Sequence, residues 1–192
     1  MSRKSVLSVI AFAAALSFGG VGAASFAYAE DSVTVGGAPM YPSKNIVENA
    51  VNSKDHTTLV AAVKAAGLVD TLEGAGPFTV LAPTNEAFAA LPAGTVDTLL
   101  KPEMKGALTG VLTYHVLAGK MTAKDIMAKV DEMGGKYTVK TVNGGEITFM
   151  KSGAKGLSVT DAKGDVAMIT IADVMQSNGV IHVVNKVLLP AG

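Results

Sequence analysis

The fold prediction depends most on one stretch, Asn178-Gly179-Val180-Ile181-His182-Val183-Val184-Asn185-Lys186-Val187-Leu188-Leu189-Pro190. One alternating face of this segment carries Val180, Val184 and Leu188. The other face carries Ile181 and Val183, so apolar residues occupy both faces. A strand with one face in water would instead alternate apolar and polar residues. The pattern therefore predicts a central β-strand that is covered on both faces, with a turn at Asn-Gly before it and a stop at the proline.

A second apolar run, Phe78 to Ala82, leads into Pro83-Thr84-Asn85. Its aromatic and β-branched residues favour a strand, and Thr84 is a suitable N-cap for a short helix over residues 85–90. We expect these two strands to form the centre of the fold. Six residues of the two segments are expected to be structural: Thr84, Asn85, Asn178, Gly179, His182 and Asn185.

Helical periodicity dominates the first part of the chain. The spacing of apolar residues predicts a helix over 43–51, with Ser43 as its N-cap, and a second helix over 57–66. Gly67 follows at the position where a left-handed C-cap is favoured. These helices precede the strand-rich part of the sequence, which is typical of an α+β arrangement.

The period of the pattern changes in the last third. Thr122, with Asp125 three residues later, is the capping box of one more helix, while residues 114–117 are expected to be extended. From Tyr137 onward apolar and polar residues alternate, and Asn143-Gly144 is a strong hairpin signal. The fold class is therefore α+β, with short antiparallel strands after the helices.

The N-terminal residues predict export. Arg3 and Lys4 precede an apolar stretch over residues 6–18, and Ala27-Tyr28-Ala29 fits a small-residue cleavage site. We interpret residues 1–29 as a signal peptide, because the apolar run is too short for a membrane span; an uncleaved anchor is the alternative. A flexible leader over 30–42, containing Gly36-Gly37, and a single domain over 43–190 follow.

Charge and composition exclude several classes of partner. Without Arg3 and Lys4 the chain carries 14 basic and 16 acidic residues, a formal charge of −2, and no cluster of cations. We therefore expect no nucleic-acid partner and no stable membrane insertion of the processed chain. The chain has no cysteine, which excludes disulfides and zinc–thiolate sites but does not argue against export. The predicted location is secreted, either periplasmic or extracellular.

No set of catalytic residues emerges from the sequence. The three histidines, His56, His115 and His182, have no metal-ligand spacing, and the apolar surroundings of His115 and His182 favour core histidines bonded to the backbone. There is no Gly-x-Ser-x-Gly elbow and no glycine-rich phosphate loop before a helix. Met127 and Met133 are interpreted as core residues that fill gaps. We expect no enzyme activity, no cofactor and no metal.

Three segments together resemble the signature motifs of the fasciclin (FAS1) domain. They are Phe78-Thr79-Val80-Leu81-Ala82-Pro83-Thr84-Asn85-Glu86-Ala87-Phe88, then Tyr114-His115-Val116-Leu117, then the stretch from Asn178 to Pro190. Asn185 stands where the family usually has Asp, and an amide can still hydrogen-bond locally. The resemblance covers residues 43–190 and implies a wedge of two β-sheets with helices packed around it.

The resemblance also implies a function. The family acts in adhesion at cell surfaces or in extracellular matrix, so the expected partner is a protein or polysaccharide there. Two stretches that animal relatives use for integrin contact correspond to Asp173-Val174 and to Tyr114 and His115, which are therefore the predicted binding residues. Two alternatives remain open: a hydrolase of the cell envelope, and a self-associating structural or stress protein.

Overall fold

The structure is a computed structural model that describes residues 32–153 and 156–191. The predicted signal peptide lies outside the described residues. The helices are α1 (Ile46–Ala50), α2 (Thr57–Ala66), α3 (Val69–Glu73), α4 (Asn85–Ala89), α5 (Thr95–Leu99), α6 (Lys105–Tyr114) and α7 (Ala123–Glu132), with 3₁₀ turns at Lys54–His56 and Pro102–Met104. The strands are β1 (Val33–Val35), β2 (Ala38–Met40), β3 (Phe78–Pro83), β4 (Val116–Ala118), β5 (Lys136–Lys140), β6 (Glu146–Ser152), β7 (Gly156–Thr160), β8 (Val166–Gln176) and β9 (Gly179–Val184).

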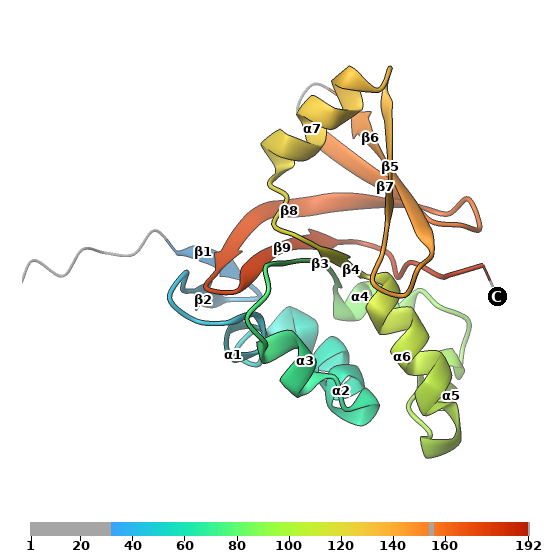
Figure 1. The fold of residues 1–192 in the computed structure, drawn as a ribbon. Helices are drawn as coiled ribbons and strands as arrows, with labels where there is room; N and C mark the ends of the chain where they lie inside the picture. Colours follow the sequence, from blue (N-terminus) through green and yellow to red (C-terminus); the bar gives the residue numbers. More distant parts are fainter. Residues whose placement is uncertain (1–31, 154–155, 192) are drawn as a thin grey trace, which may run out of the picture.

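Seven strands form one hydrogen-bonded sheet in the order β4-β3-β9-β8-β7-β6-β5. The long strand β8 belongs to both halves of it, because its first residues pair with β7 and its remaining residues pair with β9. Register shifts around Ile171 bend β8 between the two halves. Figure 1 shows the resulting wedge, with α1 to α6 below β3 and β9 and with α7 above them. The predicted α+β wedge with helices packed around it is confirmed, and the two predicted sheets are the two halves joined through β8.

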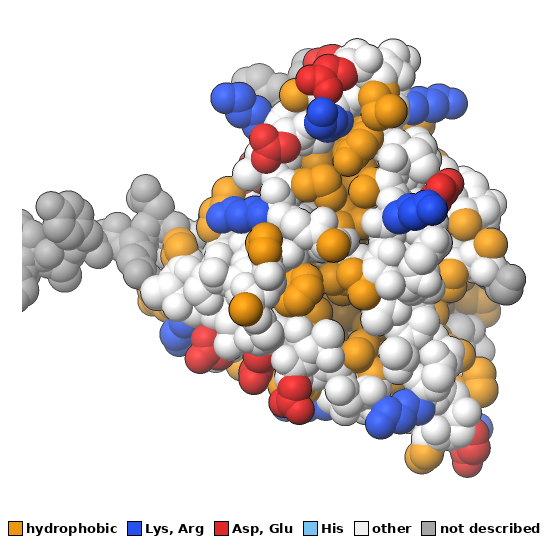
Figure 2. All heavy atoms as spheres, viewed as in Figure 1, with side chains coloured by type: hydrophobic (Ala, Val, Ile, Leu, Met, Phe, Trp, Pro, Cys, Tyr) orange, Lys and Arg blue, Asp and Glu red, His pale blue; other side chains and the backbone are white. Residues whose placement is uncertain are grey.

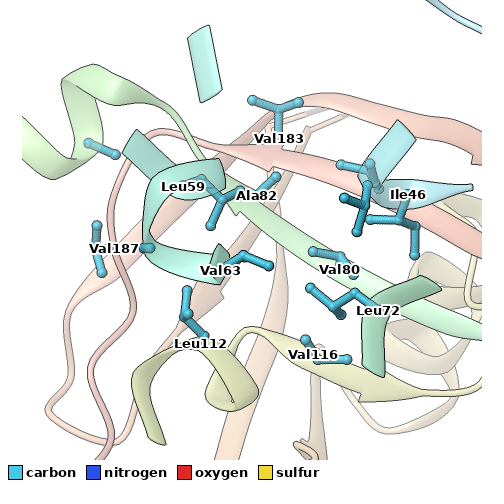
Figure 3. Packing of buried hydrophobic residues seen from close by; sticks show 14 of the residues in the cluster. Ile46, Leu59, Val63, Leu72, Val80, Ala82, Leu112, Val116, Val183 and Val187 are labelled. Atoms are coloured by element: carbon cyan, nitrogen blue, oxygen red, sulfur yellow. The ribbon is translucent and has the colours of Figure 1, made fainter. Parts of the chain in front are cut away.

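The central strands are covered on both faces, as the sequence predicted. All six residues of β9 are buried. Ile181 and Val183 face a hydrophobic cluster that α1, α2, α3 and α6 cover, which we call the helix-side cluster. Val80 of the parallel neighbour β3 joins them there (Figure 3). Val184 and Leu81 of β3 face a second cluster between the sheet and α7, which we call the sheet-side cluster. The strand itself ends at Val184, earlier than the apolar run suggested.

Local capping signals explain where several helices begin and end. The capping box of Thr122 and Asp125 at the start of α7 is confirmed, and so is Gly67 as the left-handed C-cap of α2, at φ 72°. The predicted cap of α1 is wrong, because Asn45 takes the place of Ser43. The Asn45 side chain accepts a hydrogen bond from the N–H of Glu48, whose carboxylate accepts one in return.

Two other sequence predictions are wrong in instructive ways. Residues 33–40, expected to be part of a loose leader, form the β1–β2 hairpin. Val35 and Met40, the last residue of each strand, are buried in the helix-side cluster. Three-residue strands are too short to give a clear alternating pattern. Tyr114, expected to be extended, is the last residue of α6 and continues its buried face, three residues after Val111.

Candidate functional site

The structure buries three of the four predicted binding residues. Tyr114 is 0% exposed, Val174 1% and His115 2%. Only Asp173 is partly exposed. The surface that the sequence analysis assigned to contact is therefore not assembled from these four side chains, because three of them are part of the core.

Tyr114 holds two loops together. Its hydroxyl donates a hydrogen bond to the carbonyl oxygen of Glu146, at 2.6 Å, and accepts one from the N–H of Ala162, at 2.9 Å. Both partners lie in strand connections or at a strand end that would otherwise leave backbone groups unpaired. The Tyr side chain thus joins the end of α6 to the far half of the sheet.

His115 is a neutral core histidine. Its Nε2 accepts a hydrogen bond from the N–H of Leu188 at 2.9 Å, so the proton is on Nδ1, which donates to the carbonyl oxygen of Val111 at 2.8 Å. Burial lowers the pKa of His115 to about 4, and the Val111 carbonyl opposes this only in part. The predicted core role of this histidine is confirmed.

Asp173 and His182 anchor the start of α7. Asp173 has φ 58°, and its carboxylate accepts a hydrogen bond from the N–H of Ala123 at 2.7 Å. The N–H of Asp173 donates to Nδ1 of His182, and Nε2 of His182 donates to the carbonyl oxygen of Met121 at 2.9 Å. Burial lowers the pKa of His182, which is therefore neutral. These contacts fix the segment that leads from β4 into α7.

Substitution of Asp173 tests this structural role. Asp173→Ala removes the hydrogen-bond acceptor of Ala123 and places alanine at a positive φ, so we expect a loss of about 2 kcal/mol in the free energy of unfolding. Asp173→Asn keeps an acceptor and a residue that tolerates this backbone conformation, so we expect a loss below about 1 kcal/mol. Urea denaturation of both variants measures the difference; equal losses would contradict the anchoring role.

The remaining structural residues connect elements that are distant in sequence. Thr84 is the N-cap of α4. The Asn85 side chain accepts a hydrogen bond from the N–H of Thr58 and donates one to the carbonyl oxygen of Lys54, which ties α4 to the start of α2. Asn185 accepts a hydrogen bond from the N–H of Met168, at 2.8 Å, so its amide holds β8 beside the end of β9.

Asn178 and Gly179 form the turn into β9. Asn178 is buried, and its side chain bonds to the backbone of α1 and of α3. A Cβ atom added at Gly179 would lie 2.1 Å from the carbonyl oxygen of Phe78, so only glycine fits beside the start of β3. This close approach sets the parallel register of β3 and β9.

A surface that the sequence analysis missed lies beside the Asp173 anchor. Four partly buried apolar side chains from α7, β5 and the segment before α7 pack against the sheet-side cluster and still reach the surface: Met121, Met127, Tyr137 and Val139. We call them the α7–β5 strip. Figure 2 shows hydrophobic side chains in a band between α7 and β5. Met133, the C-cap residue of α7, is 59% exposed.

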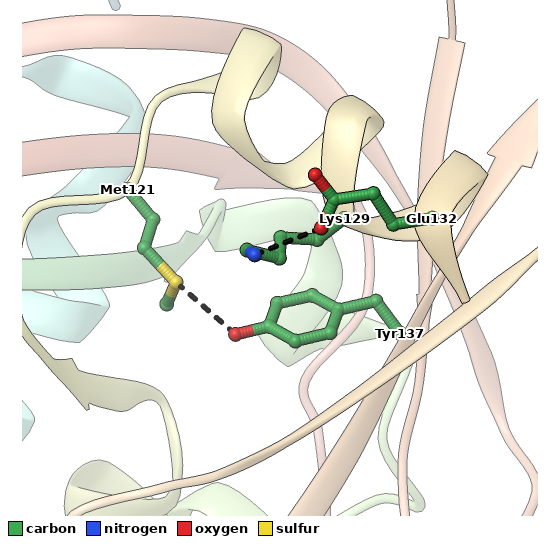
Figure 4. Close-up of polar contacts among 4 residues, drawn as sticks. All are labelled: Met121, Lys129, Glu132 and Tyr137. Carbon is green, nitrogen blue, oxygen red and sulfur yellow. Dashed lines mark hydrogen bonds and ion pairs between the residues drawn. The ribbon is translucent and has the colours of Figure 1, made fainter.

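The geometry of the strip is well defined (Figure 4). The Tyr137 hydroxyl points to the sulfur of Met121, at 3.8 Å, and the Tyr137 ring stacks on buried Phe149 with 6.4 Å between ring centroids. An ion pair between Lys129 and Glu132, at 2.9 Å, lies on α7 beside it. Methionine and aromatic side chains with a charged border are typical of protein contact surfaces.

Catalytic and metal-binding arrangements find no support among the described residues. No group of three or more histidine, cysteine or acidic side chains there could hold a metal ion. A Ser–His contact, between Ser53 and Nδ1 of His56 at 2.9 Å, involves two side chains that are only 2% and 3% exposed. Burial keeps both the Ser53 hydroxyl and the His56 ring away from bulk solvent. Across the described ranges, no helix is both long and apolar enough for a membrane span.

Comparison with known proteins identifies the protein family. A sequence model of the Fasciclin domain matches residues 54–190, so the chain belongs to the fasciclin-domain family. Its fold is similar to a FAS1 domain pair from the insect cell adhesion molecule fasciclin I, with a TM-score of 0.68 and 16% identity over 76% of this chain and 51% of that one. The two observations agree on the fold.

Several relatives are similar over most of this chain. Protein sll1483 of Synechocystis sp. is 43% identical, over 97% of this chain and 98% of that protein. Immunogenic protein MPB70 of Mycobacterium bovis is 34% identical, over 73% of this chain and 66% of its own length. Human periostin is 32% identical over 77% of this chain, which matches only 16% of periostin.

Proposed function

We propose that this protein is an exported, non-enzymatic binding protein that mediates adhesion at a cell surface or in the surrounding matrix. The observation that carries the proposal is the α7–β5 strip, a partly exposed apolar surface on a rigid fasciclin fold. Fasciclin I, whose domain pair has a similar fold, is a cell adhesion molecule, which supports the same function. The partner is a protein or a polysaccharide whose apolar face fits the strip.

The strip has the physical properties that contact requires. Met127 and Tyr137 present flexible and rigid apolar area side by side, and Phe149 supports the Tyr ring from below. Asp173 and His182 hold the start of α7, so the Met121 end of the strip is already ordered before a partner arrives. Little conformational freedom is then lost on binding, which favours affinity.

A charge placed on the strip tests the proposal. Met127→Glu puts a carboxylate in the centre of the apolar surface, so we expect at least ten-fold weaker retention of the purified protein on cells, matrix proteins or envelope polysaccharide that retain the parent. Ala128→Glu is the matched control, because it adds the same charge to an exposed position of the same helix. Equal retention of Met127→Glu and Ala128→Glu would contradict the assignment of the strip.

The two alternatives predict different results. An envelope hydrolase would turn over model esters or glycans, whereas the buried and neutral histidines lead us to expect no turnover. A self-associating protein would scatter more light per mass as its concentration rises, and Met127→Glu would abolish that rise. An adhesin that acts as a monomer shows constant scattering and a loss of retention only.

A further inference from the structure

An apolar cavity lies on the helix side of the sheet, away from the strip. Its walls come from α2, α3 and α6 and from β3 and β4, and its volume is about 80 Å³. Figure 3 shows Leu59, Val63, Leu72, Leu112 and Val116, which line it from these elements. Figure 2 shows the surface hollowed between α3 and α6, where hydrophobic side chains form the floor of the recess.

The charges around this cavity have one sign. Lys64 lines it from the exposed face of α2 and makes no ion pair within the described residues. No acidic side chain is part of the lining. A lysine that borders an apolar cavity without a nearby carboxylate is complementary to an anionic head group on an apolar chain.

Within the described part of the chain, the interior of the cavity holds no charged side chain that could pair with a carboxylate. His115 lines the wall, but both of its ring nitrogens are already bonded to backbone. His56 also lines the wall, and its Nε2 has no hydrogen-bond partner of normal geometry among the described residues. A carboxylate inside would lose its water without gaining a cation, so a head group remains at the mouth beside Lys64.

We propose that this cavity binds a free medium-chain fatty acid, with the alkyl end inside and the carboxylate beside Lys64. The cavity volume is about half of the roughly 150 Å³ that holds benzene in an engineered protein cavity. The cavity therefore accepts the end of an unbranched chain and not a ring. The rest of the chain lies in the open recess between α3 and α6.

Calorimetric titration of the purified protein with sodium octanoate tests the proposal. We expect saturable binding with one site. Each buried methylene tightens binding about four-fold, so hexanoate, which has two methylenes fewer, should bind about fifteen-fold more weakly. Val69→Trp, at a partly exposed position of the lining on α3, should block the recess and abolish binding without a large loss of stability.

The head-group contact has its own test. Lys64→Gln should weaken octanoate binding about ten-fold and leave the binding of octan-1-ol unchanged. Lys163→Gln, an exposed lysine outside the cavity lining, is the matched control and should bind as the parent does. No saturable binding of octanoate, equal binding of hexanoate and octanoate, or no effect of Lys64→Gln would each overturn the proposal. Met127→Glu should bind octanoate normally, which separates this site from the strip.

Discussion

Asn178→Ala is expected to lower the free energy of unfolding by about 3–4 kcal/mol. The buried Asn178 side chain accepts a hydrogen bond from the N–H of Ile46, at 3.1 Å, and donates to the carbonyl oxygens of Leu72 and Gly74, at 2.7 and 2.9 Å. It thus joins the start of α1 to the end of α3. Alanine leaves a buried N–H and two carbonyl groups unpaired, and each carries a desolvation cost.

An exposed asparagine provides the control for this prediction. Asn143 also bonds to backbone groups, with the carbonyl oxygen of Gly110 and the N–H of Gly145, but water can replace these contacts. We expect Asn143→Ala to cost about 1 kcal/mol. Urea denaturation measures both variants. Equal losses would mean that Asn178 does not organise the helices around the central strands.

Acidification is expected to destabilise the fold through His115, with a loss approaching about 3 kcal/mol between pH 6.5 and pH 4. The pKa of His115 is about 4 in the folded state and 6.5 as an unperturbed group. In this range the unfolded chain takes up a proton that the folded chain excludes. The stabilisation is therefore complete above pH 6.5 and is lost as the pH falls toward 4. His56 and His182 add to the loss in the same direction, because burial lowers their pKa values too.

The slope of stability against pH measures this effect. We expect His115→Gln to unfold at lower urea concentration at pH 7 but to lose less stability than the parent between pH 6.5 and 5, because it cannot take up the proton. Asp125→Asn is the control. Hydrogen bonds from Thr122 lower the pKa of this exposed carboxyl below its usual value, so the carboxyl does not titrate in that range. A His115→Gln slope equal to that of the parent would show that His115 is not the responsible group.

The sequence alone was sufficient to predict the central strands of the fold. An apolar run on both faces predicted the double coverage of β9, and the capping box at Thr122 and the cap at Gly67 correctly placed two helix ends. Long, strongly patterned segments carry this information locally. Short segments do not carry this information. The β1–β2 hairpin has only three residues in each strand, and its burial depends on contacts with distant helices.

The candidate site was much less predictable. Composition identifies apolar residues but does not tell which of them remain uncovered after folding, so Met127 and Met133 were assigned to the core. The prediction that Asp173 and Val174 form a contact site differs from the structure for another reason. A positive φ and a register shift in β8 turn Val174 into the core and direct the Asp173 carboxylate to α7, and neither feature has a signature in the sequence.

Site-specific photo-crosslinking in the cells that make the protein is the most direct test of the central claim, that the α7–β5 strip contacts a partner. A benzophenone side chain replaces Tyr137 in the strip or, as the matched control, its exposed neighbour Thr138, whose side chain points to the other face of β5. We predict a discrete cross-linked product from position 137 and none from position 138, with the product lost when Met127→Glu is added. Equal products from both positions, or none from position 137 while adhesion is intact, would contradict the account.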